Sequence, residues 1–151
     1  MPSRFVRAAV PATLALAAAG CATERDFALD RAITSVHEAA QSRITGIGSA
    51  VSQGSDRDSL VAAHGPEIFA SRPLEGGFEL DMVLYSHGEA GGGWTYEQVK
   101  VRTCVRVLVR RDRSPAAEAS ALECPPGLPA QVDGYGDIDQ TVEFDPKKAS
   151  R

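Results

Sequence analysis

One histidine and one serine stand in contexts that resemble parts of catalytic or metal sites, whereas His64 and His87 are predicted only at a helix end and a hairpin end. His37 and Glu38 begin like the zinc-protease pattern H-E-x-x-H, but position 41 is Gln. A catalytic zinc site needs three protein ligands, so we interpret His37 as a helix-edge side chain. Ser52 lies in a relaxed G-x-S-x-G pattern, which requires a strand before the serine, whereas a helix is predicted there. We therefore expect no catalytic residue and no metal site.

Six basic residues lie between positions 100 and 113. Two interpretations stay open. One is a surface that binds anions such as phosphate, lipid headgroups or a cell-wall polymer. The other, which we favour, is an outer sheet face whose basic residues pair with acids on neighbouring strands. Arg110, Arg111 and Arg113 have the fewest acidic neighbours and are the candidate anion-binding residues.

Acidic and glycine-rich loops offer two further patterns. Asp133, Asp137 and Asp139 are reminiscent of a calcium loop, but they lack the EF-hand spacing and its terminal Glu, so a solvated loop is favoured. Glycines 91–93 join two predicted strands and precede no Lys-Ser/Thr, which predicts a hairpin loop rather than a phosphate cradle. The sequence indicates no cofactor.

Aromatic residues are predicted to gather at the end of that hairpin. They are Tyr85, Trp94 and Tyr96. Such a cluster serves either as a platform for a sugar or other ligand, or as cross-strand pairs that stabilise the sheet. The second role is the more common one.

The first 21 residues have the parts of an export signal. Arg4 and Arg7 form a positive start, residues 8–19 are small or apolar, and Ala-Ala-Gly at 18–20 precedes Cys21. The apolar run is shorter than the roughly 20 residues of a membrane-spanning helix. This arrangement resembles the lipobox of bacterial lipoproteins, in which the signal is cleaved before the cysteine and the thiol carries a diacylglycerol. The resemblance implies a lipid on Cys21 and a place on the outer, extracytoplasmic face of the cell membrane.

The remaining chain has the composition of a folded domain. Hydrophobic residues make up 43% and charged residues 24% of the sequence, values typical of globular proteins. Removing residues 1–20, which contain two arginines and no acid, leaves 14 basic and 20 acidic side chains, a net charge of -6. That balance argues against nucleic acid as a partner. The domain also resembles, in general type, the small lipoproteins of high-GC Gram-positive bacteria.

A long helix is predicted directly after the lipobox. Thr23 and Asp26 have the spacing of a capping box. An apolar stripe with steps of three and four follows, which places its members on one helix face. Its members are Leu29, Ile33, Val36, Ala40, Ile44, Ile47 and Val51. The stripe either forms a short coiled coil or, as we favour, covers a sheet. Residues 58–64 predict a second, short helix, and 72–77 predict a loop.

Strands follow, because the hydrophobic period changes to two in residues 78–85 and 99–110. We predict a hairpin that sets Leu80 opposite Val101 and Asp81 opposite Lys100. In this register, apolar pairs share one face and opposite charges share the other. The loop of the hairpin is expected at residues 88–93.

A third strand is predicted at 117–124, with Cys104 directly opposite Cys124 and Arg110 opposite Glu118. Once the lipobox has used Cys21, two cysteines remain in an exported domain, which predicts a disulfide between Cys104 and Cys124. No other ligands lie near enough in sequence to favour a metal site. Residues 138–144 are expected to add a short edge strand.

These patterns predict an α+β fold: a long N-terminal helix packed on an antiparallel meander of three or four strands, with one disulfide. The expected organisation is a signal peptide at 1–20, one domain at 21–145 and a flexible tail at 146–151. Two function classes stay open. The first, favoured because no catalytic constellation is complete, is a non-catalytic module that binds an envelope protein, polymer or small ligand. The second is a small envelope hydrolase, which a pocket holding a histidine beside an acid or serine would favour.

Overall fold

The computed structural model describes residues 22–148, so the predicted signal peptide, Cys21 and residues 149–151 lie outside the described part. Helix α1 (Glu24–Ser52) starts where the capping box was predicted. The Asp26 carboxylate accepts a hydrogen bond from the Thr23 backbone N–H at 2.7 Å, and the Thr23 hydroxyl accepts one from the Asp26 N–H at 3.3 Å. Two free donors of the first turn are thereby satisfied. Helix α2 (Arg57–His64) follows, close to its predicted range.

The buried face of α1 differs from the predicted stripe in its first half. Val36, Ala40, Ile44, Ile47 and Val51 are buried as expected. Leu29 and Ile33 are only half-buried. The helix face that packs on the sheet contains instead two alanines, each one position earlier in the sequence. These are Ala28 and Ala32, which have no exposed surface. The placement of Ile33 in the core was therefore wrong.

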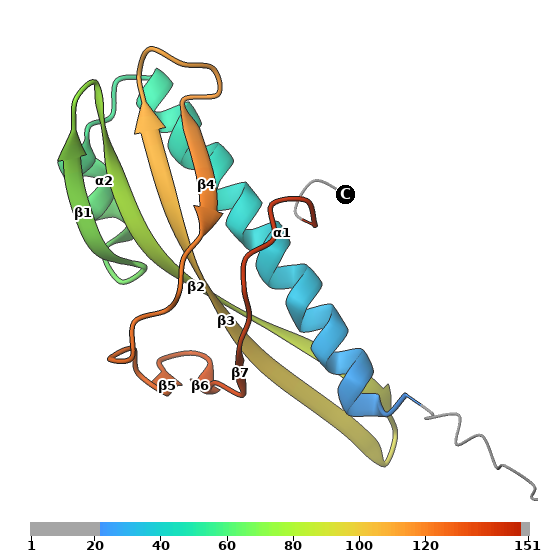
Figure 1. The fold of residues 1–151 in the computed structure, drawn as a ribbon. Helices are drawn as coiled ribbons and strands as arrows, with labels where there is room; N and C mark the ends of the chain where they lie inside the picture. The colour runs from blue at the N-terminus through green and yellow to red at the C-terminus, as the bar shows by residue number, and fades with distance from the viewer. Residues whose placement is uncertain (1–21, 149–151) are drawn as a thin grey trace, which may run out of the picture.

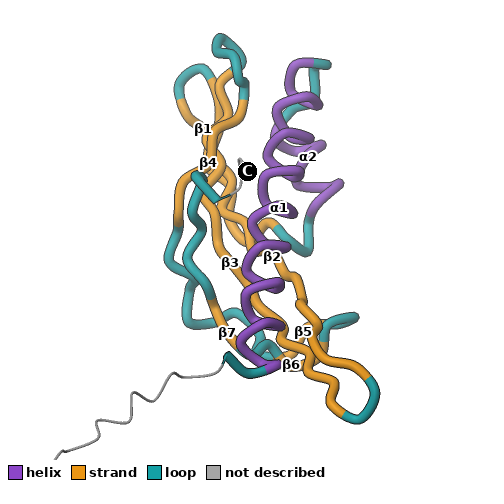
Figure 2. The backbone as a smooth tube through the Cα atoms, turned by 90° about the vertical axis from the view of Figure 1, so that its right-hand side faces the viewer, coloured by secondary structure: helices purple, strands orange, loops and turns teal. Residues whose placement is uncertain are grey.

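The sheet is an antiparallel meander of four strands with a fifth strand at its edge, which confirms the α+β fold. The meander contains β1 (Ile68–Leu74), β2 (Gly77–Gly92), β3 (Thr95–Arg110) and β4 (Ala117–Ala121). Short strand β7 (Gln140–Thr141) pairs with β3 in parallel. Both helices lie on one side of this sheet, with α1 running along β2 and β3 (Figures 1 and 2). The loop predicted at 72–77 was wrong except at residues 75–76, because β1 extends to Leu74 and β2 begins at Gly77. Pro73 is tolerated because β1 is an edge strand.

The β2–β3 hairpin is longer than predicted, and its register differs. Leu80 lies opposite Val107 rather than Val101, and Asp81 lies opposite Arg106 rather than Lys100. The displacement is an even number of residues, so the predicted apolar face is unchanged. Several basic residues alternate along β3, so more than one register pairs opposite charges, and the sequence could not choose between them. The glycines at 88–92 continue the strand, and the turn consists of Gly93 and Trp94.

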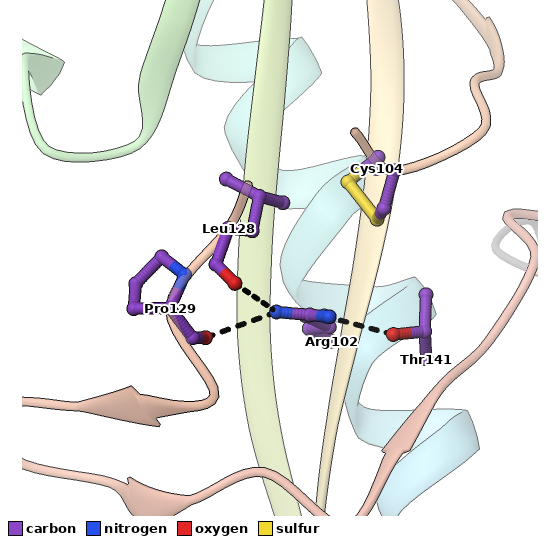
Figure 3. The surroundings of a disulfide bond; sticks show 6 residues. Arg102, Cys104, Leu128, Pro129 and Thr141 are labelled. Carbon is purple, nitrogen blue, oxygen red and sulfur yellow. Dashed lines mark hydrogen bonds between the residues drawn. A yellow bond between two sulfur atoms is a disulfide. The ribbon is translucent and has the colours of Figure 1, made fainter. Parts of the chain in front are cut away.

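The predicted disulfide between Cys104 and Cys124 is confirmed, but the strand register around it was wrong. Glu118 lies opposite Leu108 rather than Arg110, and β4 ends at Ala121. The chain then leaves the strand and returns Cys124 to within 5.3 Å of Cys104, measured between Cα atoms. The bond lies on the face of the sheet away from α1 (Figure 3). It links β3 to the start of the C-terminal segment.

The C-terminal segment crosses the outer face of the sheet and is held by Arg102 (Figure 3). This guanidinium donates to the Pro129 carbonyl at 3.0 Å and to the Thr141 hydroxyl at 2.8 Å. The segment contains the small hairpin β5 (Gln131–Val132) and β6 (Gly136–Asp137), and then β7. The expected edge strand within 138–144 is present.

The segment then packs against α1 through His37, which is 2% exposed and not the helix-edge residue that was predicted. Its Nδ1–H donates to the Ile33 carbonyl at 2.6 Å, and its Nε2 accepts the Asp145 N–H at 2.9 Å. The ring stacks on Phe144 with centroids 5.7 Å apart. Because both nitrogens are engaged by the backbone, His37 has a structural role.

Candidate functional site

A cleft of about 560 Å³ opens beside α1, where the α2–β1 connection, β2 and the β5–β6 turn meet. Arg43, His64 and Glu67 supply its basic and acidic groups, and Tyr85 and Tyr135 supply two aromatic rings. Its lining consists of Ala39, Ser42, Arg43, Gly46, His64, Glu67, Leu84, Tyr85 and Tyr135. Strand β1 pairs with β2 only as far as Met82, so the cleft lies where the edge of β2 becomes free.

Arg43 organises the polar side of the cleft. One guanidinium nitrogen donates to Glu67 Oε1 at 2.7 Å, and the other lies 3.2 Å from His64 Nδ1. Arginine can only donate, so His64 Nδ1 accepts and the proton of the neutral ring is on Nε2. The Arg43–Glu67 pair is partly exposed, and such pairs add little to stability.

Glu67 is positioned by the backbone on either side of it. Its N–H donates to the His64 carbonyl at 2.9 Å, and its carbonyl accepts the Val83 N–H at 2.8 Å. Its second carboxylate oxygen, Oε2, is buried and has no hydrogen-bond partner among the described residues. A buried acceptor without a donor is costly. This oxygen is therefore the atom of the cleft at which a bound donor would gain most.

Two tyrosines form the opposite wall. The rings of Tyr85 and Tyr135 lie 5.8 Å apart at 39°. The Tyr135 hydroxyl donates to the Tyr85 carbonyl at 3.3 Å, which occupies one acceptor on the free edge of β2. Burial raises the pKa of Tyr85, and the charge of Arg102 opposes that effect. The Tyr85 phenol is therefore neutral near pH 7.

Sequence patterns did not indicate this site. Arg43, Glu67 and Tyr135 belong to no motif, and His64 was noticed only as a helix-end residue. The predicted aromatic cluster at the hairpin end was wrong for Tyr85, while Tyr96 lies next to the turn as expected. Tyr85 lies opposite Arg102, whereas Trp94 is in the hairpin turn. Tyr85 therefore joins the cleft, and Trp94 stands at another part of the molecule.

The basic residues of β3 are used mainly within the protein. Asp81 accepts two hydrogen bonds from Arg106, at 2.8 and 3.0 Å, and one from Arg72 at 2.8 Å. Glu79 also pairs with both arginines. These contacts raise the pKa of Arg106, chiefly through the hydrogen bond to Asp81. They form the salt-bridged outer face that the sequence analysis favoured.

The three candidate anion-binding arginines do not line one hollow. Arg110 and Arg113 lie together beside Pro115 and Glu118. Arg111 lies on the other side of the loop, where it donates to the Ser55 carbonyl at 3.5 Å. Arg110 Nε is buried without a hydrogen-bond partner among the described residues. Anion binding at Arg110, Arg111 and Arg113 stays a prediction.

Two other sequence candidates have structural roles. The Ser52 hydroxyl donates to the Gly48 carbonyl at 2.9 Å within α1. Asp139 accepts the Lys100 N–H at 2.8 Å and an Arg25 hydrogen bond at 3.1 Å. The backbone contact is the main reason that the pKa of Asp139 is lowered. Within residues 22–148, no group of three His, Cys, Asp or Glu side chains is arranged to hold a metal ion.

Comparisons with protein-family models, curated proteins and solved structures give no match for this chain. Neither helix in residues 22–148 combines the length and the apolar character needed to cross a membrane.

Proposed function

We propose that this chain is a lipid-anchored lipoprotein of the cell envelope, on the extracytoplasmic face of the membrane. Its domain would act as a non-catalytic binding module whose ligand occupies the cleft beside α1. The anchor rests on the signal-like residues 1–20 and on Cys21. The start of α1 three residues after Cys21 supports this proposal, because it leaves only a short connection between lipid and domain.

The observation that carries the binding proposal is the unpartnered Glu67 Oε2, a buried acceptor on a residue that lines the cleft. A turn of the Glu67 carboxylate toward the cleft would let an amine or hydroxyl donor of a ligand satisfy this oxygen, while the apolar part of the ligand contacts Tyr85 and Tyr135. Hydrogen bonds to charged groups contribute about 1.5–3 kcal/mol. An amine or sugar of modest size therefore fits the chemistry of the cleft.

Binding is favoured over hydrolysis even though a histidine, an acid and Ser42 line the same cleft. A histidine that activates a serine must accept its proton through an unprotonated nitrogen. The His64 nitrogen that can accept, Nδ1, already faces the guanidinium of Arg43. Within the described residues, Ser42 has no hydrogen bond to His64.

The cleft can be tested by titrating the isotope-labelled chain from Cys21 onward with a diamine, putrescine, and with an oligosaccharide, the N-acetylglucosamine tetramer. We expect one of them to shift the backbone amide resonances of residues 42–46, 64, 65, 67, 84 and 85. Glu67→Gln should weaken that binding by about tenfold or more, since it removes a charge-assisted hydrogen bond.

A matched control is Asp58→Asn, which removes an exposed carboxylate that does not line this cleft. It should leave the affinity unchanged. Shifts that map elsewhere, binding that Glu67→Gln leaves intact, or no response to either probe would contradict the proposal.

The anchor has its own test. Cys21→Ala should leave an uncut precursor or release the protein into the medium, because the lipid is attached through that thiol. Fractionation of cells expressing the wild type and the variant would measure this. A Cys21→Ala protein that is cleaved and still fractionates with membranes would refute the anchor.

A further inference from the structure

We infer that the β2–β3 turn is a second membrane contact, in which Trp94 enters the headgroup region of the bilayer that carries the lipid on Cys21. The inference rests on the proposed anchor. It assigns a role to a part of the molecule that the cleft does not use.

Trp94 is fully exposed, with 104% relative accessibility, and it is the single tryptophan of the chain. Among the exposed large hydrophobic residues of the described part, Tyr96 follows at 60% and Phe27 at 54%. A tryptophan carries a large apolar surface that usually dominates cores or interfaces. Full exposure at a turn therefore indicates a surface that is covered in another environment.

The composition of the turn fits a bilayer interface. Residues 90–96 read AGGGWTY and contain no charge, and they are flanked by Glu89 and Glu97. The Tyr96 hydroxyl bonds to the Glu89 carboxylate, which lowers the pKa of Glu89 and raises that of Tyr96. Tryptophan and tyrosine concentrate at headgroup level because each has an apolar body and a polar group.

The part of β2 that leads into the turn packs against the first half of α1. Gly88 lies against the backbone of α1 at Ala28 and Ala32, in a space that any side chain would fill. The Arg31 guanidinium donates to the Glu89 carbonyl at 2.7 Å. These contacts hold the turn end of β2 against α1, and the short hairpin beyond them carries Trp94.

The start of α1 is also where the lipid would be. Thr23 is two residues from Cys21, and two residues span at most about 7 Å. Figures 1 and 2 show the first turn of α1 and the β2–β3 turn at the same end of the molecule. A bilayer that holds the Cys21 lipid would therefore lie within reach of Trp94. Two contacts would orient the domain, with the β1–β2 and β3–β4 turns at the end away from the membrane.

The test uses the chain from Cys21 onward, which contains every described residue. Cys104 and Cys124 are bonded to each other, so the Cys21 thiol can be coupled selectively to maleimide-bearing lipid in phosphatidylcholine vesicles. Trp94 then reports its own surroundings as the single tryptophan. Coupling should shift its fluorescence to shorter wavelength, make brominated lipids quench it, and protect it from acrylamide.

The control is the double variant Trp94→Ser, Leu74→Trp, which moves the tryptophan to an exposed position near the β1–β2 turn. Its fluorescence should be insensitive to coupling and to brominated lipids. Trp94 fluorescence that coupling does not change would overturn the inference, including the case in which the turn binds a protein instead. Equal quenching of both tryptophans would also overturn it, because the domain would then have no fixed orientation.

Because the maleimide supplies the anchor chemically, this result does not depend on lipidation in cells. Failure of the Cys21→Ala test and failure of Trp94 insertion are therefore separate outcomes.

Discussion

The two halves of the β2–β3 hairpin meet α1 with side chains of very different size. In the half next to β1 and β4, bulky residues of the hairpin and helix share one core. They are Phe78, Leu80, Met82, Ile44, Ile47 and Val51. In the half next to the β2–β3 turn, β2 presents Ser86, Gly88 and Ala90, and α1 presents Ala28 and Ala32.

This difference follows from the width of the sheet. A helix across four strands leaves a volume that large side chains must fill. Near the β2–β3 turn the sheet narrows to β2 and β3, and burial there depends on close backbone approach. In one half the core is filled by large side chains of β2 and α1, and in the other small residues of β2 and α1 let the helix approach closely beside Val99 and Val101 of β3.

The largest expected effect tests the close approach. Gly88→Val should destabilise the domain by about 3 kcal/mol or more, since its side chain would meet the backbone of α1 at Ala28 and Ala32. Urea unfolding would measure it. Gly46→Ala, at a helical site with open space around it, is the control and should stabilise by up to about 1 kcal/mol. A small effect of Gly88→Val would mean that the helix is not in close contact with β2.

The next effect concerns the disulfide, which connects β3 to the C-terminal segment midway between the two halves. Replacing Cys104 and Cys124 together by Ala should cost roughly 3 kcal/mol, because the bond closes a loop with a sequence separation of 20. The midpoint of urea unfolding would show the loss. Adding reductant to the wild type should give a similar shift, and to the variant none.

A smaller effect is expected at Val101, on β3 in the narrow half. Val101→Ala should cost on the order of 1–3 kcal/mol, since the side chain is fully buried. Lys100→Ala, its neighbour on the other face, should cost well under 1 kcal/mol. Equal unfolding midpoints for the two variants would contradict the assignment of faces.

The smallest effect depends on pH. The pKa of Asp139 is lowered by the Lys100 N–H and then by Arg25. A lower pKa in the folded state means that this carboxylate stabilises the fold above its unfolded value of about 4. That contribution is lost as the pH falls through the folded pKa. Asp139→Asn should therefore be less stable than the wild type at pH 7 and nearly equal at pH 2. A pH-independent difference between their urea midpoints would show that the charge is not the cause.

Some features of this protein were determined by the sequence alone because they depend on neighbours in the chain. The Thr23–Asp26 capping box and the alternating faces of β2 and β3 are of this kind. The Cys104–Cys124 bond was predicted by counting, since the lipobox resemblance leaves one pair. It formed even though the predicted strand register was wrong.

Other features were decided only in the tertiary structure. The hairpin register depends on where the turn forms. The glycine-rich sequence at 88–92 predicts a loop when taken alone, and it is a strand because Gly88 allows close packing against α1. The burial of Ala28 and Ala32 in place of Leu29 and Ile33 also follows from the close packing of α1 on Gly88. The cleft joins Arg43, Glu67 and Tyr135, which lie far apart in sequence. Local sequence patterns do not predict that these residues lie close together, because their proximity depends on how the helix, the sheet edge and the C-terminal segment pack.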